Sequence, residues 1–271
     1  HVDCVRELLQ HEAAARVAAT NAVGRTALIS AAENGHAECV RELLQHDPAA
    51  QVGATLHTGT TALMVAAREG HLECVQQLLQ HQPAAQVHAI DMDGDTALIL
   101  AARRGHTECV RELLQHEPAT QVKAAGRHGD TALIAAAHGG HIECVQALLQ
   151  HDPAAQILAT NDDNDTALIF AASKGHAKVV RELLYCHPAA QVVAANSDGD
   201  TALIAAAHEG HTECVRVLLR YEPAAQVKAA ALDGKTALIR AARMAHTDCV
   251  RELLKHNPTE QVKVIDYRGC S

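Results

Sequence analysis

The chain has 271 residues, of which 48% are hydrophobic but only 1% aromatic, and its formal net charge at pH 7 is −9. The scarcity of aromatic side chains argues against stacking platforms for single-stranded nucleic acid and against cages for quaternary ammonium groups. The acidic net charge leaves no chain-wide basic field to hold a phosphate backbone, so we expect no nucleic acid partner. No apolar run reaches the roughly 18 residues of a membrane-spanning helix, so we expect no membrane segment.

One motif recurs every 35 residues along the chain. The pair Gly35-His36 is followed 35 residues later by Gly70-His71, and the series continues to Ala245-His246. Repetition with such a period indicates a row of similar units rather than one globular core. We therefore expect a single repeat array over residues 1–271, with a partial repeat at 1–25 and the start of a further repeat at 264–271. Seven full repeats begin near residues 26, 61, 96, 131, 166, 201 and 236.

Each repeat begins with a short predicted helix. In the repeat that starts at Thr96, small and apolar residues at positions 97, 98, 101 and 102 have the spacing of a closely packed helix. The hydroxyl of Thr96, or the carboxylate of Asp95 before it, can accept hydrogen bonds from the first free amides. Gly105 then separates this helix from the next one.

A second helix follows in every repeat. After His106, apolar residues come three, four, seven and eight positions later, which forms one continuous stripe along a helix. All seven prolines of the chain occupy one position just after this helix, as Pro118 does, and we expect each to end it. The Ala-Ala-Gln-Val sequence that follows most of them, with its Gly- and Asp-rich continuation, predicts an extended crossing and a tight turn.

The repeated residues carry a family resemblance. The pattern Thr-x-Leu-x-x-Ala-Ala-x-x-Gly-His, followed by x-Glu-x-Val-x-x-Leu-Leu, recurs in nearly every unit over essentially the whole chain. In these residues the chain resembles the ankyrin-repeat family. The resemblance implies an all-α ankyrin-repeat solenoid of stacked helix-turn-helix units with projecting turn loops. It also implies a concave groove that binds protein partners.

The repeats differ from the usual ankyrin pattern in two places. Ankyrin repeats usually have about 33 residues, with Pro directly after the Thr and His three positions after it. Here Ala62 follows Thr61, and Met64 stands at the His position. The passage that usually reads Gly-Ala-Asp-Val-Asn is replaced by Pro-Ala-Ala-Gln-Val. Because each unit is longer by about two residues, we expect a longer corner after the second helix.

Most of the 9 cysteines and 20 histidines follow the repeat as well. Equivalent residues of stacked repeats are separated by roughly 8 to 10 Å. That separation is too long for a shared zinc ion or for a disulfide. We therefore expect reduced thiols that fill gaps in the core, no metal and no cofactor, and a cytoplasmic or nuclear location. Histidines such as His106 are expected to bond to the turn between helices, and those such as His116 to cap the second helix.

Three short motifs look chemical but belong to the repeat. The His-x-Glu at 36–38 resembles part of a zinc deaminase signature but lacks its cysteine partners. The Gly-Lys-Thr at 234–236 ends like a phosphate-binding loop without its first glycine. Aspartates alternate at 91–95 as calcium ligands do, but no glutamate follows at the required position. We interpret all three as turns or helix starts and expect no enzyme activity.

The positions that vary between repeats are the candidates for binding. Variation is greatest at the turn tip and at the end of the first helix, which line one surface in the ankyrin architecture. The tips collect Asp, whereas the helix ends collect Arg and Lys, so we expect a partner protein with an acidic or phosphorylated segment. Because Arg and aromatic residues are frequent interface anchors, Arg103, Arg104 and Phe170 are the first candidates. The candidate partner-binding residues are Arg68, Leu100, Arg103, Arg104, Arg127, His128, His138, Phe170, Lys174, His208, Arg240 and Arg243.

The sequence thus predicts a non-catalytic scaffold that binds a partner protein through the groove and turn tips. We expect a monomer that binds neither nucleic acid nor membranes. Two alternatives stay open at this point. The array can be a targeting or architectural arm of a larger effector or enzyme, or it can be a designed or consensus repeat protein. Both ends of the chain fall inside a repeat, so we expect the array to continue beyond them.

Overall fold

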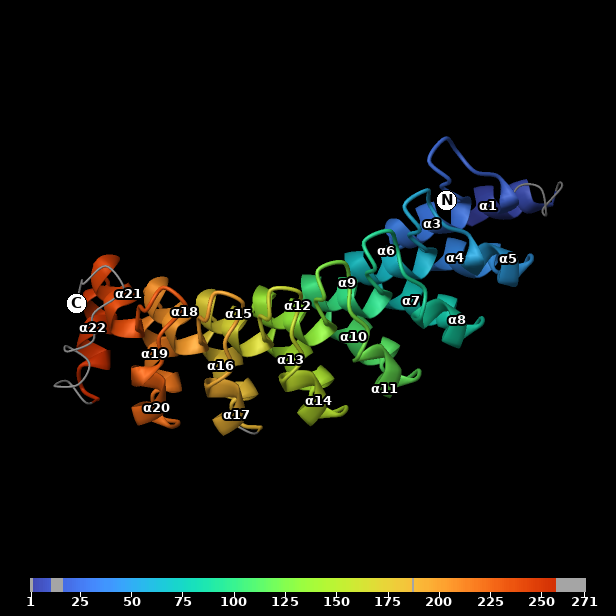
Figure 1. Cartoon of the computed structure of the whole chain (residues 1–271). Helices are drawn as coiled ribbons and strands as arrows, with labels where there is room; N and C mark the ends of the chain where they lie inside the picture. The colour runs from blue at the N-terminus through green and yellow to red at the C-terminus, as the bar shows by residue number, and fades with distance from the viewer. Residues whose placement is uncertain (1, 11–16, 187, 257–271) are drawn as a thin grey trace. The chain divides into compact units, whose positions relative to one another are not determined.

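The computed structural model describes residues 2–10, 17–186 and 188–256. The chain divides into two compact units, His1–Arg127 and His128–Ser271, each of which consists of stacked repeats. Unit 1 contains helices α1 to α11, and unit 2 contains helices α12 to α22 (Figure 1). The expected start of a further repeat at 264–271 lies outside the described residues.

Every full repeat begins with a helix of seven or eight residues, which we call its first helix. In unit 1 the first helices are α3 (Ala27–Glu33), α6 (Ala62–Glu69) and α9 (Ala97–Arg104). In unit 2 they are α12 (Ala132–Gly139), α15 (Ala167–Ser173), α18 (Ala202–His208) and α21 (Ala237–Arg243). The predicted threonine cap is confirmed, since Thr96 Oγ1 accepts a hydrogen bond of 3.3 Å from the amide of Ile99. Such a cap satisfies one of the free amides at the start of a helix.

The second helix of each repeat is also where the sequence predicts it. In unit 1 the second helices are α1 (Val2–Leu9), α4 (Ala37–Leu43), α7 (Leu72–Leu79) and α10 (Thr107–Leu113). In unit 2 they are α13 (Ile142–Leu148), α16 (Ala177–Leu183), α19 (Thr212–Leu218) and α22 (Thr247–Leu253). The apolar stripe of α10 is confirmed, because Cys109, Val110 and Leu113 are all buried.

Among the described residues a third, shorter helix follows six of the second helices, where the sequence predicted an extended crossing. In unit 1 the third helices are α5 (Pro48–Gly53), α8 (Pro83–Val87) and α11 (Pro118–Gln121). In unit 2 they are α14 (Pro153–Ile157), α17 (Pro188–Val192) and α20 (Pro223–Lys228). The prediction was wrong because proline suits the first position of a helix, where its fixed φ is helical and its missing N–H is not needed. The chain turns sharply just before it, and Glu117 has a φ of 45°.

A buried glutamine attaches each third helix to the second helix before it. Gln86 Nε2 donates to the carbonyl oxygens of Leu78, at 2.7 Å, and of His81, at 2.5 Å. The carbonyl oxygen of Leu78, at the end of α7, also accepts the amide of His81 at 3.1 Å, and His81 itself lies in the turn after the helix. The same pair of bonds is made by Gln51, Gln86, Gln121, Gln156, Gln191 and Gln226. The longer corner expected from the sequence is thus a helix held by one side chain.

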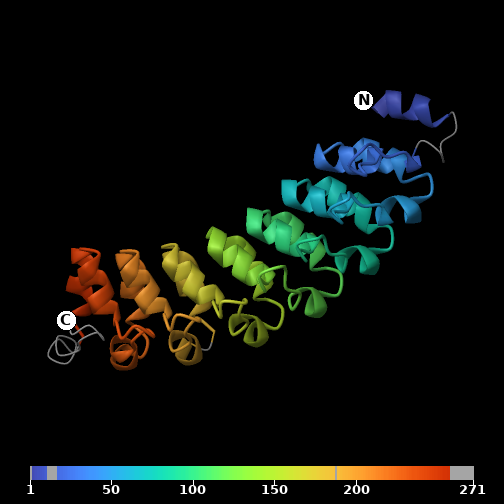
Figure 2. The ribbon, with the colours of Figure 1, turned by 45° about the horizontal axis from the view of Figure 1, so that its top comes forward.

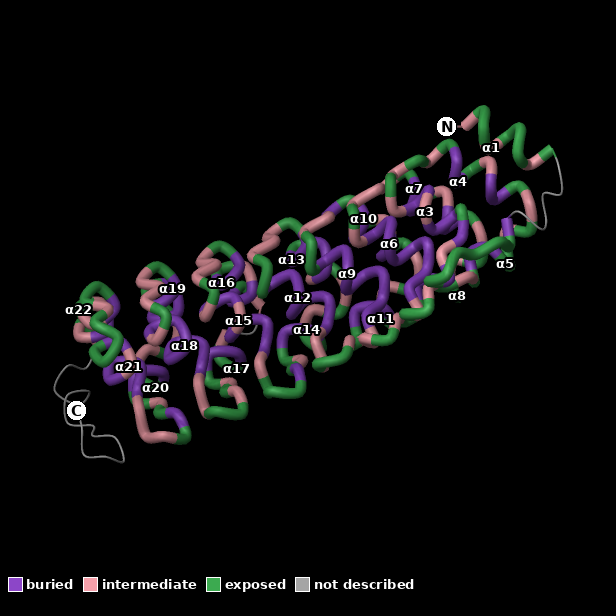
Figure 3. Tube along the Cα trace, turned by 90° about the horizontal axis from the view of Figure 1, so that it is seen from above, coloured by how far each residue is buried: buried purple, intermediate pink, exposed green. Residues whose placement is uncertain are grey.

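Neighbouring repeats pack through like helices within each unit. The first helices α3, α6 and α9 lie side by side in unit 1, and α12, α15, α18 and α21 do so in unit 2 (Figure 2). The second helices form a parallel row. Figure 3 shows that the buried residues run along the first helices. Ala66 and Ala67 of α6 are fully buried, and such small side chains let the helices approach closely. The predicted all-α fold of stacked helix pairs is confirmed.

A glycine and a histidine connect neighbouring repeats. Gly210 follows α18 with a φ of 79°, and an added Cβ there would lie 2.6 Å from Nδ1 of His246 in the next repeat. The ring of His246 in turn bonds through Nε2 to the carbonyl oxygen of His208, at 3.0 Å. The same bond joins His71 to Glu33 in unit 1. The predicted bond therefore exists, but its carbonyl belongs to the preceding repeat.

Candidate functional site

Loops between repeats line up at one edge of each unit. In unit 1 the amide of Met92 donates to the carbonyl oxygen of Thr58, at 2.8 Å. In unit 2 the amide of Ser197 donates to Asp163, also at 2.8 Å, and that of Leu232 donates to Asp198 at 2.9 Å. Each loop is thus hydrogen-bonded to the loop of the next repeat, and the variable tip residues are held in a row.

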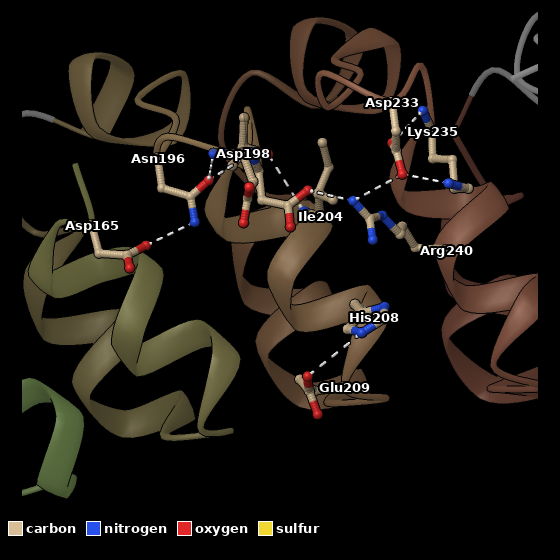
Figure 4. A network of polar contacts seen from close by, with 11 residues as sticks. Asp165, Asn196, Asp198, Ile204, His208, Glu209, Asp233, Lys235 and Arg240 are labelled. Atoms are coloured by element: carbon tan, nitrogen blue, oxygen red, sulfur yellow. Dashed lines mark hydrogen bonds and ion pairs between the residues drawn. The ribbon is translucent and has the colours of Figure 1, made fainter. Parts of the chain in front are cut away.

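Asparagine and aspartate side chains make a second connection between loops in unit 2 (Figure 4). Asn196 Oδ1 accepts hydrogen bonds from the amides of Asp198, at 3.1 Å, and Asp200, at 2.9 Å, which closes its own turn. Its Nδ2 donates to Asp165 Oδ1 in the preceding repeat, at 2.9 Å. The carboxylate of Asp165 is therefore fixed at the base of the loop, beside the start of α15.

Arg240 of α21 makes the corresponding connection one repeat later. Its Nη2 lies 3.2 Å from Asp200 Oδ1 and 3.4 Å from Asp233 Oδ2 (Figure 4). A hydrogen bond from Lys235 lowers the pKa of Asp233 below its ordinary value. Burial nevertheless raises the pKa of Asp200 above its ordinary value, an effect that the charge of Arg240 reduces. Arg240 thus binds two carboxylates of its own chain.

A cavity of about 190 Å³ lies between α15 and α18 in unit 2. Its walls combine polar side chains from the loops with an aromatic ring and apolar side chains from the helices. Six of the lining residues are Asp165, Phe170, Asn196, Asp200, His208 and Glu209. The ring of Phe170 is half-buried and stands edge-on to the ring of His138, with 5.2 Å between the ring centroids. The cavity thus joins a loop-tip surface to the exposed side of the first helices.

The arginines at the corresponding helix ends of unit 1 bind carboxylates of their own unit. Arg103 donates two hydrogen bonds to the buried Asp95, at 2.5 and 2.9 Å. Arg68 Nε donates to Glu69 at 2.8 Å, and this bond lowers the pKa of Glu69 below its ordinary value. Arg104, by contrast, is exposed and makes no ion pair or hydrogen bond with the described residues.

The candidate residues predicted from the sequence fall in both units. Unit 1 holds Arg68, Leu100, Arg103, Arg104 and Arg127, and unit 2 holds His128, His138, Phe170, Lys174, His208, Arg240 and Arg243. Leu100 is only 8% exposed, so it belongs to the packed core rather than to an accessible surface. Arg127 lies at a loop tip and pairs with Asp93 at 2.9 Å. Phe170 and His208 lie on one cavity.

Sequence reasoning missed the carboxylates of that cavity. Asp165 and Asp200 occupy the same position as Asp95, where the sequence predicts that either the aspartate or the threonine after it caps the helix. In the structure the threonine caps the helix, as Thr166 and Thr201 do, and the aspartate is left for other contacts. One signal was available in the sequence, because residues 169–173 at the end of the neighbouring first helix include no cationic side chain.

The motifs that looked chemical are structural in the described chain. Asp91 Oδ1 accepts hydrogen bonds from the amides of Asp93 and Asp95, at 3.0 and 2.9 Å, and these bonds close the turn. Lys235 pairs with Asp233. No cluster of His, Cys, Asp or Glu among the described residues has the arrangement of a metal site. None of the eight described cysteines is in a disulfide.

Burial makes the repeated cysteines poor nucleophiles. It raises the pKa of the Cys74 thiol to about 11 and that of Cys214 to about 12. A thiol must lose its proton to react, so these side chains are inert packing residues at neutral pH. Among the described residues, no helix is both long and apolar enough to cross a bilayer.

Comparisons with known proteins agree with this architecture. A family model that describes three copies of the ankyrin repeat matches the chain over residues 1–55, 44–125, 63–152, 115–196 and 189–266. The crystal structure of the human ASB11 ankyrin repeat domain is similar, with a TM-score of 0.71 and 25% sequence identity. That match covers 84% of this chain and 98% of the ASB11 chain. No curated protein sequence matches the chain significantly.

Proposed function

Because the chain belongs to the ankyrin-repeat family, whose repeats generally serve protein–protein interaction, we propose that it is a non-catalytic scaffold that binds a partner protein. The binding surface consists of the loop tips and the exposed ends of the first helices, which we call the groove surface of each unit. The observation that carries this proposal is the difference in burial between the recurring and the variable residues of the repeat. The leucines and alanines that recur in the first helices are buried in stacking, whereas several variable residues, such as Arg104, Arg127 and Lys174, are exposed at the loop tips and helix ends.

Two residues are suited to anchor a partner. Phe170 is the single phenylalanine of the chain and lines an open cavity in unit 2. Arg104 in unit 1 is exposed and makes no hydrogen bond or ion pair with a described residue, so its guanidinium is available to a partner. Aromatic and arginine side chains carry a large share of binding energy in protein interfaces. Arg103 is a weaker candidate because its guanidinium already binds Asp95.

The buried, reduced cysteines suit a protein of the cytoplasm or nucleus, where thiols stay reduced. We propose that location, and a monomeric state, together with the scaffold function. The acidic partner expected from the sequence has weaker support. Three of the arginines on which that expectation rested, Arg68, Arg103 and Arg240, bind carboxylates of the chain itself.

The test compares substitutions on the groove surface with matched substitutions elsewhere. A partner is first captured on the purified chain, identified, produced separately, and its Kd measured by calorimetry. In unit 2, Phe170→Ala is compared with Tyr185→Ala, since Tyr185 is an aromatic residue that is 87% exposed at the end of a second helix. In unit 1, Arg104→Ala is compared with Arg111→Ala, an exposed arginine on α10.

We expect a groove substitution to weaken binding by about tenfold or more, the size of a typical interface anchor, with each control within about twofold. Far-ultraviolet circular dichroism must show unchanged helicity in all four variants. If the Tyr185 and Arg111 variants lose as much affinity as their matched groove variants, the groove surface is not the binding surface.

A further inference from the structure

The cavity of unit 2 is lined by acidic side chains without a lysine or arginine. Its lining includes the carboxylates of Asp165, Asp200 and Glu209, and it includes no lysine or arginine. The nearest guanidinium, that of Arg240, lies on the far side of Asp200 and is shared with Asp233. A cavity lined in this way attracts a cation and repels an anion.

Asp165 is the carboxylate best placed to receive that cation. Its Oδ1 accepts a hydrogen bond from the neutral Asn196, and its Oδ2 accepts none from the described residues. Burial raises the pKa of Asp165 above its ordinary value, and the nearby carboxylates of Asp163, Asp198 and Asp130 raise it further. The carboxylate therefore lacks a counter-charge within its own unit.

The lining of the same cavity also includes an aromatic ring. Phe170 lines the same cavity, and the edge-on contact with His138 fixes the orientation of its ring. His208 also lines the cavity, and its Nδ1 is buried without a hydrogen-bond partner among the described residues. An aromatic face attracts a cation, and the attraction grows where water is excluded.

We propose that this cavity binds an arginine side chain of the partner protein, with the guanidinium between Phe170 and the carboxylate of Asp165. This inference rests on the proposed scaffold function and names the partner chemistry that one part of the groove surface selects. Arginine fits better than lysine, because its planar guanidinium stacks on aromatic rings and forms paired hydrogen bonds with a carboxylate. A partner segment with an acidic side chain at this point would meet the carboxylate of Asp165, which no described cation of its own unit neutralises.

The single phenylalanine provides a direct test. Replacing it with 4-fluorophenylalanine in the 271-residue chain places one fluorine nucleus in the cavity, since residue 170 is the one Phe in this sequence. The probe is the peptide acetyl-Gly-Arg-Gly-amide, and its control is the same peptide with citrulline, which has nearly the same shape but no charge. A third peptide with Glu in place of Arg represents the acidic partner.

We expect the arginine peptide to shift the fluorine resonance in a saturable way and the citrulline and glutamate peptides to leave it unchanged. Asp165→Asn should raise the Kd of the arginine peptide by about tenfold, which is the effect of losing one charge-assisted hydrogen bond. Asparagine keeps an oxygen for Asn196, so the loop is retained. The matched control Asp163→Asn removes the same charge from an exposed position of the same loop and should change the Kd by less than about twofold.

Each other outcome overturns either the arginine proposal or the scaffold function on which it rests. An equal shift with the citrulline peptide means that the cavity selects its ligand by shape rather than by charge. Tighter binding of the glutamate peptide means that the cavity prefers an acidic partner. Equal effects of the two asparagine substitutions mean a diffuse field instead of a site. If the arginine peptide does not bind while Phe170→Ala still abolishes partner binding, the proposal that the cavity binds arginine is wrong, and the scaffold function is still supported. If the arginine peptide binds but no groove substitution affects the partner, the scaffold function falls instead.

Discussion

Replacing Gly210 with alanine tests whether the glycine of one repeat and the histidine of the next are energetically coupled. Gly210 adopts a φ of 79°, and a Cβ at this position would lie 2.6 to 2.9 Å from three atoms of the His246 ring. The ring cannot move away without losing a hydrogen bond, because its Nε2 is bonded to the carbonyl oxygen of His208 at 3.0 Å. The substitution therefore combines backbone strain with displacement of a hydrogen-bonded ring.

The two contributions have known sizes. A non-glycine residue in the left-handed region costs roughly 1–2 kcal/mol. Loss of the hydrogen bond of His246 costs about 1 kcal/mol more. We therefore expect Gly210→Ala to destabilise the α21–α22 repeat by about 2–3 kcal/mol. Because stability in a repeat protein is a sum of local and nearest-neighbour contributions, the effect should be strongest in this repeat.

The chain supplies its own control. Ala245 occupies the position equivalent to Gly210, with a φ of 59°, and its Cβ already bears the backbone strain. Ala245→Gly should therefore stabilise the same repeat, by about 0.5–1 kcal/mol after the added flexibility of glycine in the unfolded chain is subtracted. Removing the ring with His246→Ala should make Gly210→Ala less harmful by about 1 kcal/mol or more, since the space then becomes free.

The assay is hydrogen exchange of the amides in α21 and α22, measured by mass spectrometry under conditions where the rate reports the opening free energy. A loss of 2–3 kcal/mol corresponds to exchange about 30- to 150-fold faster. If Gly210→Ala costs the same with and without the His246 ring, the two residues are not coupled. The close approach would then have no energetic consequence, and the glycine would serve its backbone conformation alone.

Three further predictions follow from buried polar and titratable groups. Gln121→Ala should destabilise unit 1 by about 1–3 kcal/mol in urea titration, because the carbonyl oxygen of His116 loses its donor and that of Leu113 keeps only the amide of His116. Its exposed neighbour on α11, Thr120→Ala, should change stability by less than about 0.5 kcal/mol. In a native thiol-labelling time course at pH 7.5, Cys74 and Cys214, with pKa values of about 11 and about 12, should react at least about 100-fold more slowly than exposed thiols. Equal rates before unfolding would contradict their burial. Because the pKa of Asp165 is raised, the folded state binds this proton more tightly than the unfolded chain does, so the ionised carboxylate lowers stability at neutral pH. Asp165→Asn should then raise the free energy of unfolding at pH 7 by less than about 1 kcal/mol, and the gain should vanish as the pH falls through the raised pKa to below about 3.9.

The first and second helices could be predicted because their signals are local and repeated. The spacing of Cys109, Val110 and Leu113 is that of a helical stripe, and the threonine before each first helix is a known cap. Seven copies of the same pattern remove the ambiguity that one copy would have. The conformation of Gly105, with a φ of 78°, also follows from its place between two helices.

The third helix could not be predicted in the same way. Its sequence, Pro-Ala-Ala-Gln-Val, is too short to show a helical period, and an isolated helix of this length is unstable in water. What stabilises it is the bond from a glutamine such as Gln156 to Leu148, eight residues earlier, at 2.7 Å. That bond depends on where the second helix ends in space. A single glutamine in the sequence gives no sign of it.

The sequence indicated where the variable residues lie, but not which of their charges are paired within the chain. The variable helix ends do lie at an exposed surface, as the comparison of repeats indicated. The sequence counted the charges of arginines such as Arg103 and Arg240 without their partners. Asp95 and Asp200 come from loops eight and 40 residues earlier in the chain. Which charges remain available to a partner is a property of these pairings, and they appear only in the folded repeat.

The cavity of unit 2 is held open by bonds on both of its sides. At the loop side Asn196 bonds to Asp165 at 2.9 Å, and at the other end of α15 the ring of His211 bonds to the carbonyl oxygen of Ser173 at 3.0 Å. Both bonds join consecutive repeats, so α15 and α18 cannot separate without breaking them. A ligand that enters a preformed site does not have to order it, and its affinity then reflects its direct contacts. Substitutions of Phe170 and Asp165 should for that reason act on the dissociation rate of a partner more than on its association rate.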